Sequence, residues 1–499
     1  MKKSGWVSFL AVFFLIINFS ISSVKILFFG RVVYFLFLIT LFFFLRKFNI
    51  SKILKILVGG ISFIIFTYGI IQKFVLFPIY LNNFIPGDNF YSQAIIERIK
   101  SGRIFAFFRL PTLYAIICAL LILFIFHYLL KSSKKKPSTL FFVLFWTFLL
   151  VLGLINLVLT QSFGGLIYLS VGILIYLFLS GILNFKFLAP ILMTLFLFFS
   201  ITVALRYSEA KKLEPITLRF SNWVQAARAI SSSPFWGVGL GNYESTISYF
   251  THRYEAKSIY AHNFFLQFLA ETGVIIPFFL ILLLIFSRKK LIPGNPREKE
   301  TVLYISVFFI LLTYNLIDIG FYFFSAGISV VIVLSQLYPI PAYPEKCRNQ
   351  EKLKLNLTAL TLLSTLLVVE AVSENYRIEG DLLMSMDHKN YAEVENNYKK
   401  SSGINPYNFK VLMGYGSMNF ARGNPREAEK YLDSALILYP DASFAHYWKS
   451  RLELKKGHLF NAFFHASHAY RKNPLDSRYK KWYLEMKNYL ENRIRQVNQ

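Results

Sequence analysis

The sequence predicts an all-α protein, with a polytopic membrane domain followed by a soluble helical domain. Hydrophobic residues make up 55% of the 499 positions and charged residues only 16%, which is more apolar than an ordinary soluble protein. The apolar residues fall in blocks of about 20, the length that a helix needs to cross a bilayer. After Ser373 the composition changes to that of a soluble domain in which prolines recur regularly.

About eleven apolar runs are long enough to cross the membrane as helices. They are residues 6–22, 26–45, 53–71, 110–130, 140–159, 164–183, 187–205, 263–286, 302–319, 321–337 and 355–372. An alternative for the first run is a signal peptide cleaved after its small residues near Ser22. We favour an uncleaved span because the next apolar run begins almost at once.

The basic connections set the predicted orientation. Lys and Arg are concentrated at the amino end and in residues 46–55, 131–136, 288–299 and 346–354, and eleven spans would place all of these on one side. Because cytoplasmic loops are rich in Lys and Arg, that side is assigned to the cytoplasm. Residues 78–109, 206–262 and the carboxyl end are then extracytoplasmic. The chain divides into a membrane domain, 1–373, and a carboxyl-terminal domain, 374–499.

The net charge of +27 does not indicate a nucleic-acid partner. No basic face with interleaved stacking aromatics is present, and many cations lie in the connections between apolar runs. The two cysteines, Cys118 and Cys347, lie in an apolar run and a basic connection. They predict neither a disulfide framework nor a metal site.

The carboxyl-terminal domain has an internal period. Pro406, Pro440 and Pro474 recur every 34 residues, and Gly423 with Gly457 keeps the same spacing. A period of 34 is typical of tetratricopeptide repeats, in which pairs of helices stack into a solenoid. We therefore expect a partner-binding module here. The alternative is an irregular helical domain with chance proline spacing.

The large loop, 206–262, holds the richest set of candidate functional residues. Residues 215–230 are predicted to form an amphipathic helix along the membrane surface, with Arg219, Trp223 and Ala226 on one face. The alternative role for Arg219 is a snorkelling contact with lipid headgroups. Glycines at 237, 239 and 241 indicate tight turns, because the full dinucleotide-binding fingerprint is absent.

A histidine stands where the loop meets the span 263–286. His262 lies at the outer lip of that span, and Glu271 lies about two and a half turns deeper. A histidine in such a place can exchange protons near neutral pH. Taken alone, its alternative is a structural role.

Together, these segments resemble the signature region of the bacterial O-antigen ligase and polymerase superfamily. The resemblance rests on Arg219 and Trp223, on Pro234 with Gly-Val-Gly-Leu-Gly-Asn, and on His262-Asn263 with Glu271-Thr-Gly273. Upstream, Gly102-Arg103 to Pro111 resembles the family's arginine-phenylalanine segment, and Leu159 to Gly165 resembles its Ser-Arg-Gly segment. Phe163 stands where an arginine is frequent, and Arg109 stands where a small or amide residue is usual. Arg109 or Arg206 is a candidate replacement for the missing arginine.

The resemblance implies a GT-C-like glycosyltransferase in the bacterial cytoplasmic membrane. Such enzymes move a glycan from undecaprenyl pyrophosphate to a hydroxyl of a glycolipid, another lipid-linked glycan or a protein. Planar, permanently charged arginines suit the pyrophosphate, so Arg219 and Arg103 are assigned to it. His262 is assigned as the acceptor-activating base or as a donor-binding group, with Asn263 and Glu271 in support. Asp318 is a candidate to orient His262 or Arg219, the alternative being a simple interfacial aspartate.

No cofactor is expected. The acidic residues of the outer loops are scattered and do not form a clustered pair of metal-ligand character, so we expect metal-independent transfer.

Among the activities of this superfamily, that of a ligase is slightly favoured over those of a polymerase and of a protein O-oligosaccharyltransferase. A lipid-linked glycan transporter would place its ionisable groups near the membrane midplane, whereas these candidates gather at the outer lip. A membrane-tethered scaffold would not need so many spans.

Overall fold

The fold is described from a computed structural model, and the described residues form helices without strands. These residues are 3–48, 50–83, 99–108, 110–132, 139–182, 193, 214–251, 258–287, 298–338, 350–384, 389–474 and 476–497. The predicted span 187–205 therefore lies outside the description except for its residue 193. The other predicted spans fall on described helices, although the span 263–286 consists of two helices and not one.

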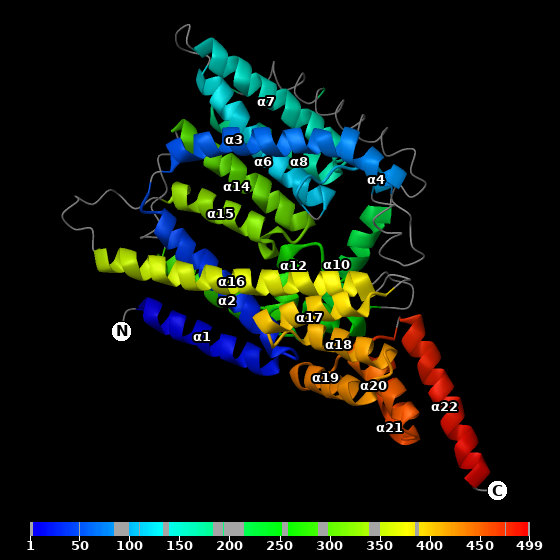
Figure 1. Cartoon of the computed structure of the whole chain (residues 1–499). Helices are drawn as coiled ribbons and strands as arrows, with labels where there is room; N and C mark the ends of the chain where they lie inside the picture. The colour runs from blue at the N-terminus through cyan, green and yellow to red at the C-terminus, as the bar shows by residue number, and fades with distance from the viewer. Residues whose placement is uncertain are drawn as a thin grey trace.

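The membrane domain is built from long apolar helices with shorter ones between them (Figure 1). Its first half contains α1 (Lys3–Ile21), α2 (Lys25–Leu45), α3 (Ser51–Ile71), η1 (Gln72–Leu76), α4 (Phe77–Asn83), α6 (Pro111–Ser132), α7 (Thr139–Leu159) and α8 (Phe163–Leu179). The second half contains α10 (Glu214–Ser232), α11 (Tyr243–Thr246), η2 (Ile247–Tyr249), α12 (Phe264–Thr272), α13 (Ile275–Ser287), α14 (Lys299–Ile317), η4 (Gly320–Tyr322), α15 (Phe324–Leu337) and α16 (Gln350–Met384).

Among the described residues, six helices are long and apolar enough to cross a membrane, or seven if α12 and α13 form one broken span. Shorter apolar helices match three more predicted spans, at residues 12–21, 163–179 and 324–337. The protein is thus a multi-pass helical membrane protein.

One predicted span is wrong in its shape. Residues 263–286 were expected to form a continuous helix, but α12 and α13 meet at an angle of 111°. Gly273 ends α12 with a φ of 64°, a conformation that favours glycine. A side chain at Gly273 would overlap the backbone of Phe235, because the loop before α12 packs into this break. Glu271 therefore lies in the last turn of a short helix, not inside a continuous span.

The core of the membrane domain centres on α6, the most buried of the spans. Tyr114 of α6 donates a hydrogen bond to Oδ1 of Asn156 in α7 at 2.8 Å, and Nδ2 of Asn156 donates to the carbonyl of Phe66 in α3 at 3.1 Å. Buried polar groups need such partners, so these bonds fix three helices in one arrangement. Helices α8, α14 and α15 pack beside them (Figure 1).

The carboxyl-terminal helices recur at the predicted period. They are α17 (Tyr391–Ile404), α18 (Phe409–Ala421), α19 (Pro425–Leu438), α20 (Ser443–Lys455), α21 (Leu459–Lys472) and α22 (Ser477–Val497). The first helices of successive pairs begin 34 residues apart, at Phe409 and Ser443, as do the second helices at Pro425 and Leu459. Helix pairs with this spacing are the geometry of stacked repeats, and the tetratricopeptide assignment itself stays a prediction.

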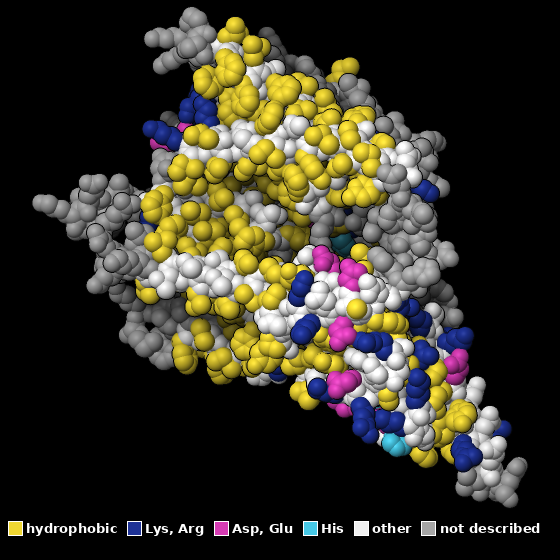
Figure 2. Space-filling model, viewed as in Figure 1, with side chains coloured by type: hydrophobic (Ala, Val, Ile, Leu, Met, Phe, Trp, Pro, Cys, Tyr) yellow, Lys and Arg dark blue, Asp and Glu magenta, His cyan; other side chains and the backbone are white. Residues whose placement is uncertain are grey.

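The change in composition at Ser373 does not fall between two helices. Helix α16 runs from Gln350 to Met384 without a break, so one helix belongs both to the apolar bundle and to the carboxyl-terminal array, meaning the end of α16 together with α17–α22. Figure 2 shows hydrophobic side chains over the bundle and charged side chains over the array. The array and α10 lie at one end of the bundle, and the amino terminus lies at the opposite end (Figure 1).

Candidate functional site

His262 stands at the start of α12 with its backbone and its ring both fixed. Its φ is 50°, an uncommon conformation for a residue with a side chain. The next residue, Asn263, caps α12 by accepting a hydrogen bond from the backbone N–H of Leu266 at 3.0 Å. Nδ1 of His262 lies 3.3 Å from Oδ1 of Asp318. Strain of this kind is commonly found at functional positions.

Asp318 also faces Arg219. Nη2 of Arg219 lies 3.9 Å from Oδ2 of Asp318, so one carboxylate serves both a histidine and an arginine. Asp318 follows the last turn of α14 and is only 5% exposed. Its Oδ1 accepts from the backbone N–H of Ile319 at 2.9 Å, and its carbonyl accepts from that of Phe264 at 3.0 Å. The carboxylate is therefore held in place from both sides of the site.

The predicted face of α10 presents Arg219 to this carboxylate. Trp223, one turn on, donates a hydrogen bond from Nε1 to the carbonyl of His262 at 3.1 Å. Ala226 is fully buried in a small cluster with Ala261 and Ala270. Because Ala226 is small, α10 can approach α12 closely, and this brings Arg219, Trp223 and His262 together.

The glycine loop anchors the far end of α12. Gly237, Gly239 and Gly241 all have positive φ, at 68°, 100° and 77°, so the prediction of tight turns is confirmed. The N–H of Gly239 donates to the carbonyl of Glu271 at 2.9 Å, and that of Gly241 donates to Oε2 of Glu271 at 2.8 Å. A side chain at Gly237 would overlap the backbone of Glu271, so only glycine fits there.

Glu271 reaches the His262 segment through another side chain. Nε2 of Gln267 donates to Oε1 of Glu271 at 3.2 Å, and Oε1 of Gln267 accepts from the N–H of Ala261 at 3.1 Å. The same carboxylate accepts from the phenol of Tyr322 at 2.6 Å. Glu271 thus supports the loop that carries His262 without touching the imidazole. Nearby, burial and the Glu271 carboxylate raise the pKa of the Tyr243 phenol, which stays protonated.

The other predicted arginines are not brought to Asp318 in the described part of the chain. Nε of Arg103 donates to the carbonyl of Thr160 at 3.0 Å, next to Ser162, which caps the start of α8. Arg109 and Arg206 lie outside the described residues.

Tyr168 of α8 packs edge-on against Tyr314 of α14, with ring centroids 5.4 Å apart, and Tyr314 is one turn before Asp318.

Two polar residues of the first spans were missed by the sequence analysis. Asn18 in α1 donates to the carbonyls of Trp236 and Glu271, at 2.7 and 3.0 Å, and its Oδ1 accepts from the N–H of Leu240 at 2.8 Å. Arg31 in α2 lies over the ring of Tyr322, 4.5 Å from its centroid. A polar or charged residue inside an apolar run is itself a signal of function, and this signal could have found both.

The arrangement is suited to proton transfer beside an anion. With Asp318 accepting from Nδ1–H, the tautomer of His262 leaves Nε2 unprotonated and able to accept a proton. Nε2 has no hydrogen-bond partner in the described part of the chain, and the side chain is 30% exposed. The Arg219 side chain is 26% exposed, so its other N–H donors can meet an oxyanion. Within the described ranges, no group of three or more His, Cys, Asp or Glu is arranged to hold a metal ion.

Residues 148–281 match the O-antigen ligase family. This segment begins in α7 and ends in α13, and it contains Arg219, Trp223, His262, Asn263 and Glu271. No curated protein and no solved structure matches the chain. This match covers part of the membrane domain, and it supports a relationship between that segment and the O-antigen ligase/polymerase superfamily of membrane proteins.

Proposed function

We propose that the protein transfers a glycan from undecaprenyl pyrophosphate to an acceptor hydroxyl on the extracytoplasmic face, as a surface-polysaccharide ligase. The observation that carries this proposal is the Asp318 carboxylate placed between His262 and Arg219. One carboxylate orients a base for the acceptor and a cation for the leaving group. The family match supports the reaction class.

The reaction exchanges one bond for another at the first carbon of the donor sugar. The acceptor oxygen forms a bond to this carbon as its proton passes to Nε2 of His262. The bond between the carbon and the pyrophosphate oxygen breaks, and undecaprenyl pyrophosphate leaves with the electron pair. Arg219 donates to the oxygen on which negative charge develops, a contact whose loss costs about a hundred- to a thousandfold in rate.

The remaining assignments complete the proposed site. Arg103, Arg109, Arg206 and Asn263 are proposed to bind the pyrophosphate and the glycan, with Trp223 and Glu271 in support. Figure 2 shows a hollow between α3 and α16 with hydrophobic side chains at its rims, which favours entry of the polyprenyl chain from the bilayer. Transfer is proposed to need no metal ion, so chelation should leave it intact.

The test is a transfer assay with purified protein and the lipid-linked glycan extracted from its own host. The wild type is compared with His262→Ala and Arg219→Ala, and the products are resolved by size on a gel. A single shift of the acceptor, lost in both variants, supports a ligase. A ladder of increasing glycan length supports a polymerase instead, and a shifted protein band supports protein glycosylation. If the donor is never consumed, a transporter of lipid-linked glycan replaces the enzyme.

A further inference from the structure

A second site lies where the membrane bundle meets the carboxyl-terminal array. A cavity of about 550 Å³ opens between α2, α16 and the segment 405–410, a volume within the range of sites for small ligands. Its walls come from segments that are far apart in the chain. Residues of the array therefore form part of the cavity wall.

The spanning helices contribute many apolar side chains to the wall, and the array contributes mainly amide, aromatic and charged ones. Among the residues that α2, α15 and α16 contribute are Ile26, Leu27, Phe324, Leu367 and Val368. The array contributes Asn405, Tyr407, Asn408, Phe409 and Lys410. Apolar side chains on spanning helices match a lipid chain, whereas amides and aromatic rings match the hydroxyl groups and the faces of sugars.

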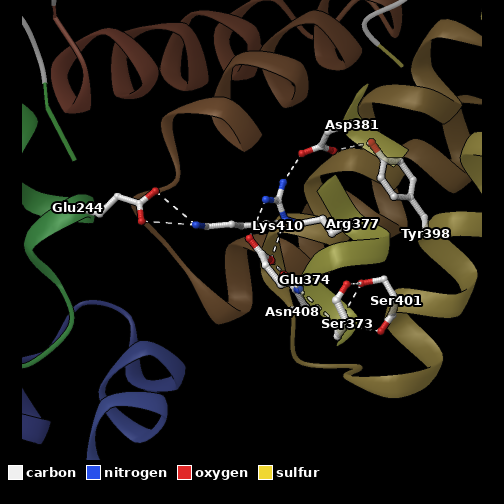
Figure 3. A network of polar contacts seen from close by, with 9 residues as sticks. All are labelled: Glu244, Ser373, Glu374, Arg377, Asp381, Tyr398, Ser401, Asn408 and Lys410. Carbon is white, nitrogen blue, oxygen red and sulfur yellow. Dashed lines mark hydrogen bonds and ion pairs between the residues drawn. The ribbon is translucent and has the colours of Figure 1, made fainter. Parts of the chain in front are cut away.

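The charged groups of the array end are already paired (Figure 3). Nζ of Lys410 lies 3.3 Å from a carboxylate oxygen of Glu244 in the large loop. Glu374 accepts from Nε of Arg377 at 2.8 Å and from Asn408 at 3.4 Å. These bonds connect the array to α16 and to the loop that precedes His262.

Two further charged groups, Arg31 and Glu370, line the cavity. Arg31 donates from Nη1 to the carbonyl of Tyr322 at 3.4 Å, which leaves most of its five N–H donors available. The carboxylate of Glu370, also in the lining, attracts Arg31 and Lys410 electrostatically, and the described part of the chain shows no hydrogen bond to it. Ionisable residues on spanning helices that line a cavity are candidates for a substrate path in membrane proteins.

The cavity adjoins the candidate site. Tyr260 lines the cavity, and its ring packs edge-on against the imidazole of His262 with centroids 6.5 Å apart. Tyr322, which also lines the cavity, donates to Glu271. A molecule held in the cavity would therefore lie one aromatic ring away from His262.

We propose that this cavity binds the acceptor, and that the acceptor is a glycan anchored to a lipid. Its lipid lies along α2 and α16 in the bilayer, and its sugars reach the array, where Tyr407 and Asn408 contact them. This inference rests on the proposed transfer reaction and narrows its acceptor to a lipid-anchored glycan, which excludes a soluble protein. It also gives the array a role in acceptor selection within the same chain.

The test measures acceptor and donor kinetics separately. Val368, 59% exposed in the cavity wall, is replaced by Trp to block the lipid end, and Leu366→Trp on the same helix is the matched control because it does not line the cavity. Tyr407→Ala, at an exposed ring, tests the sugar end. The acceptor probe is the glycolipid extract of host cells that lack the protein, used intact or after mild acid has released the glycans.

We expect Val368→Trp to raise KM for intact glycolipid at least tenfold and to leave KM for the donor and for released glycan unchanged. Tyr407→Ala should raise KM for both acceptor forms, and Leu366→Trp should change neither. A rise in donor KM instead would assign the cavity to the donor and overturn the proposal, as would equal use of intact and released glycan by the wild type. Absence of transfer by the wild type with any acceptor would count against the proposed function itself.

Discussion

The carboxylate of Asp318 lies 3.3 Å from Nδ1 of His262 and 3.9 Å from Nη2 of Arg219. Three elements meet at this point, because Arg219 is on α10, His262 precedes α12 and Asp318 follows α14. A buried carboxylate between an imidazole and a guanidinium orients both groups and stabilises the imidazolium that forms when a proton is taken up.

Replacing Asp318 by Asn should lower kcat by about 10² to 10⁴-fold, because an amide no longer fixes the required tautomer of His262. Donor binding should change little. Glu300→Gln is the matched control at the other end of α14, where Glu300 forms an exposed ion pair with Lys131. Steady-state transfer kinetics check both variants. Equal activities for the two would remove Asp318 from the site.

A methyl group at Gly237 should destabilise the protein. Gly237→Ala places a side chain against the backbone of Glu271 in addition to the cost of about 1 to 2 kcal/mol for a left-handed alanine. Gly181→Ala isolates the second effect, because Gly181 has a φ of 69° and nothing within 4 Å of an added Cβ. Thermal unfolding in detergent should show a clearly larger fall in Tm for Gly237→Ala. Equal falls would mean that the loop does not pack as described.

The array should lose stability as the pH falls. His446 is buried, its Nε2 donates to the carbonyl of Pro440 at 2.8 Å, and its Nδ1 lies 2.8 Å from that of His465. Burial, helped by the charges of His468 and His465, lowers the pKa of His446 to about 4. The unfolded chain takes up this proton near pH 6.5 and the folded chain only near 4. Stability is therefore complete above about pH 6.5 and falls between these values, by about 3 kcal/mol over the whole interval.

Hydrogen exchange of α20 and α21 in the full-length protein measures this effect locally, as protection at pH 7.5 compared with pH 5 after correction for the intrinsic rate. His446→Gln keeps a donor for Pro440 but cannot titrate, so its protection should depend less on pH. An unchanged pH dependence in His446→Gln would assign the effect to another group.

The ion pair between Lys410 and Glu244 should contribute little to stability. The two side chains are 29% and 41% exposed, and pairs of this kind are worth about 0.2 to 1 kcal/mol. A double-mutant cycle with Lys410→Ala and Glu244→Ala, read by thermal unfolding, measures the coupling. A coupling well above this range would show that the pair carries much of the contact between array and loop.

Short-range patterns predicted much of the fold and of the site. Apolar runs gave the helices, the 34-residue period gave the array, and helical spacing placed Arg219 and Trp223 on one face. Asp318, near the outer end of a span, was a candidate to orient His262 or Arg219, with a simple interfacial aspartate as the alternative. Each of these predictions depends on neighbours in sequence or on a single charge.

The features that could not be predicted from the sequence depend on contacts between segments that are far apart in the chain. The bend at Gly273 exists because Phe235 occupies the break, and no pattern around Gly273 reports that contact. The cavity needs α2 beside α16, which are separated by most of the membrane domain. The composition of the chain changes at Ser373, which led us to expect a boundary there. Helix α16 nevertheless continues through Ser373, because no proline or glycine interrupts residues 350–379.

The central claim is that His262 acts in the chemical step and not in holding the donor. Single-turnover transfer of labelled lipid-linked glycan by His262→Ala, measured beside equilibrium binding of the same donor, tests it most directly. The account predicts donor affinity within about twofold of the wild type and a rate lower by about 10² to 10⁴-fold. A rate within tenfold of the wild type, or a loss of donor binding that accounts for the lost rate, would contradict it.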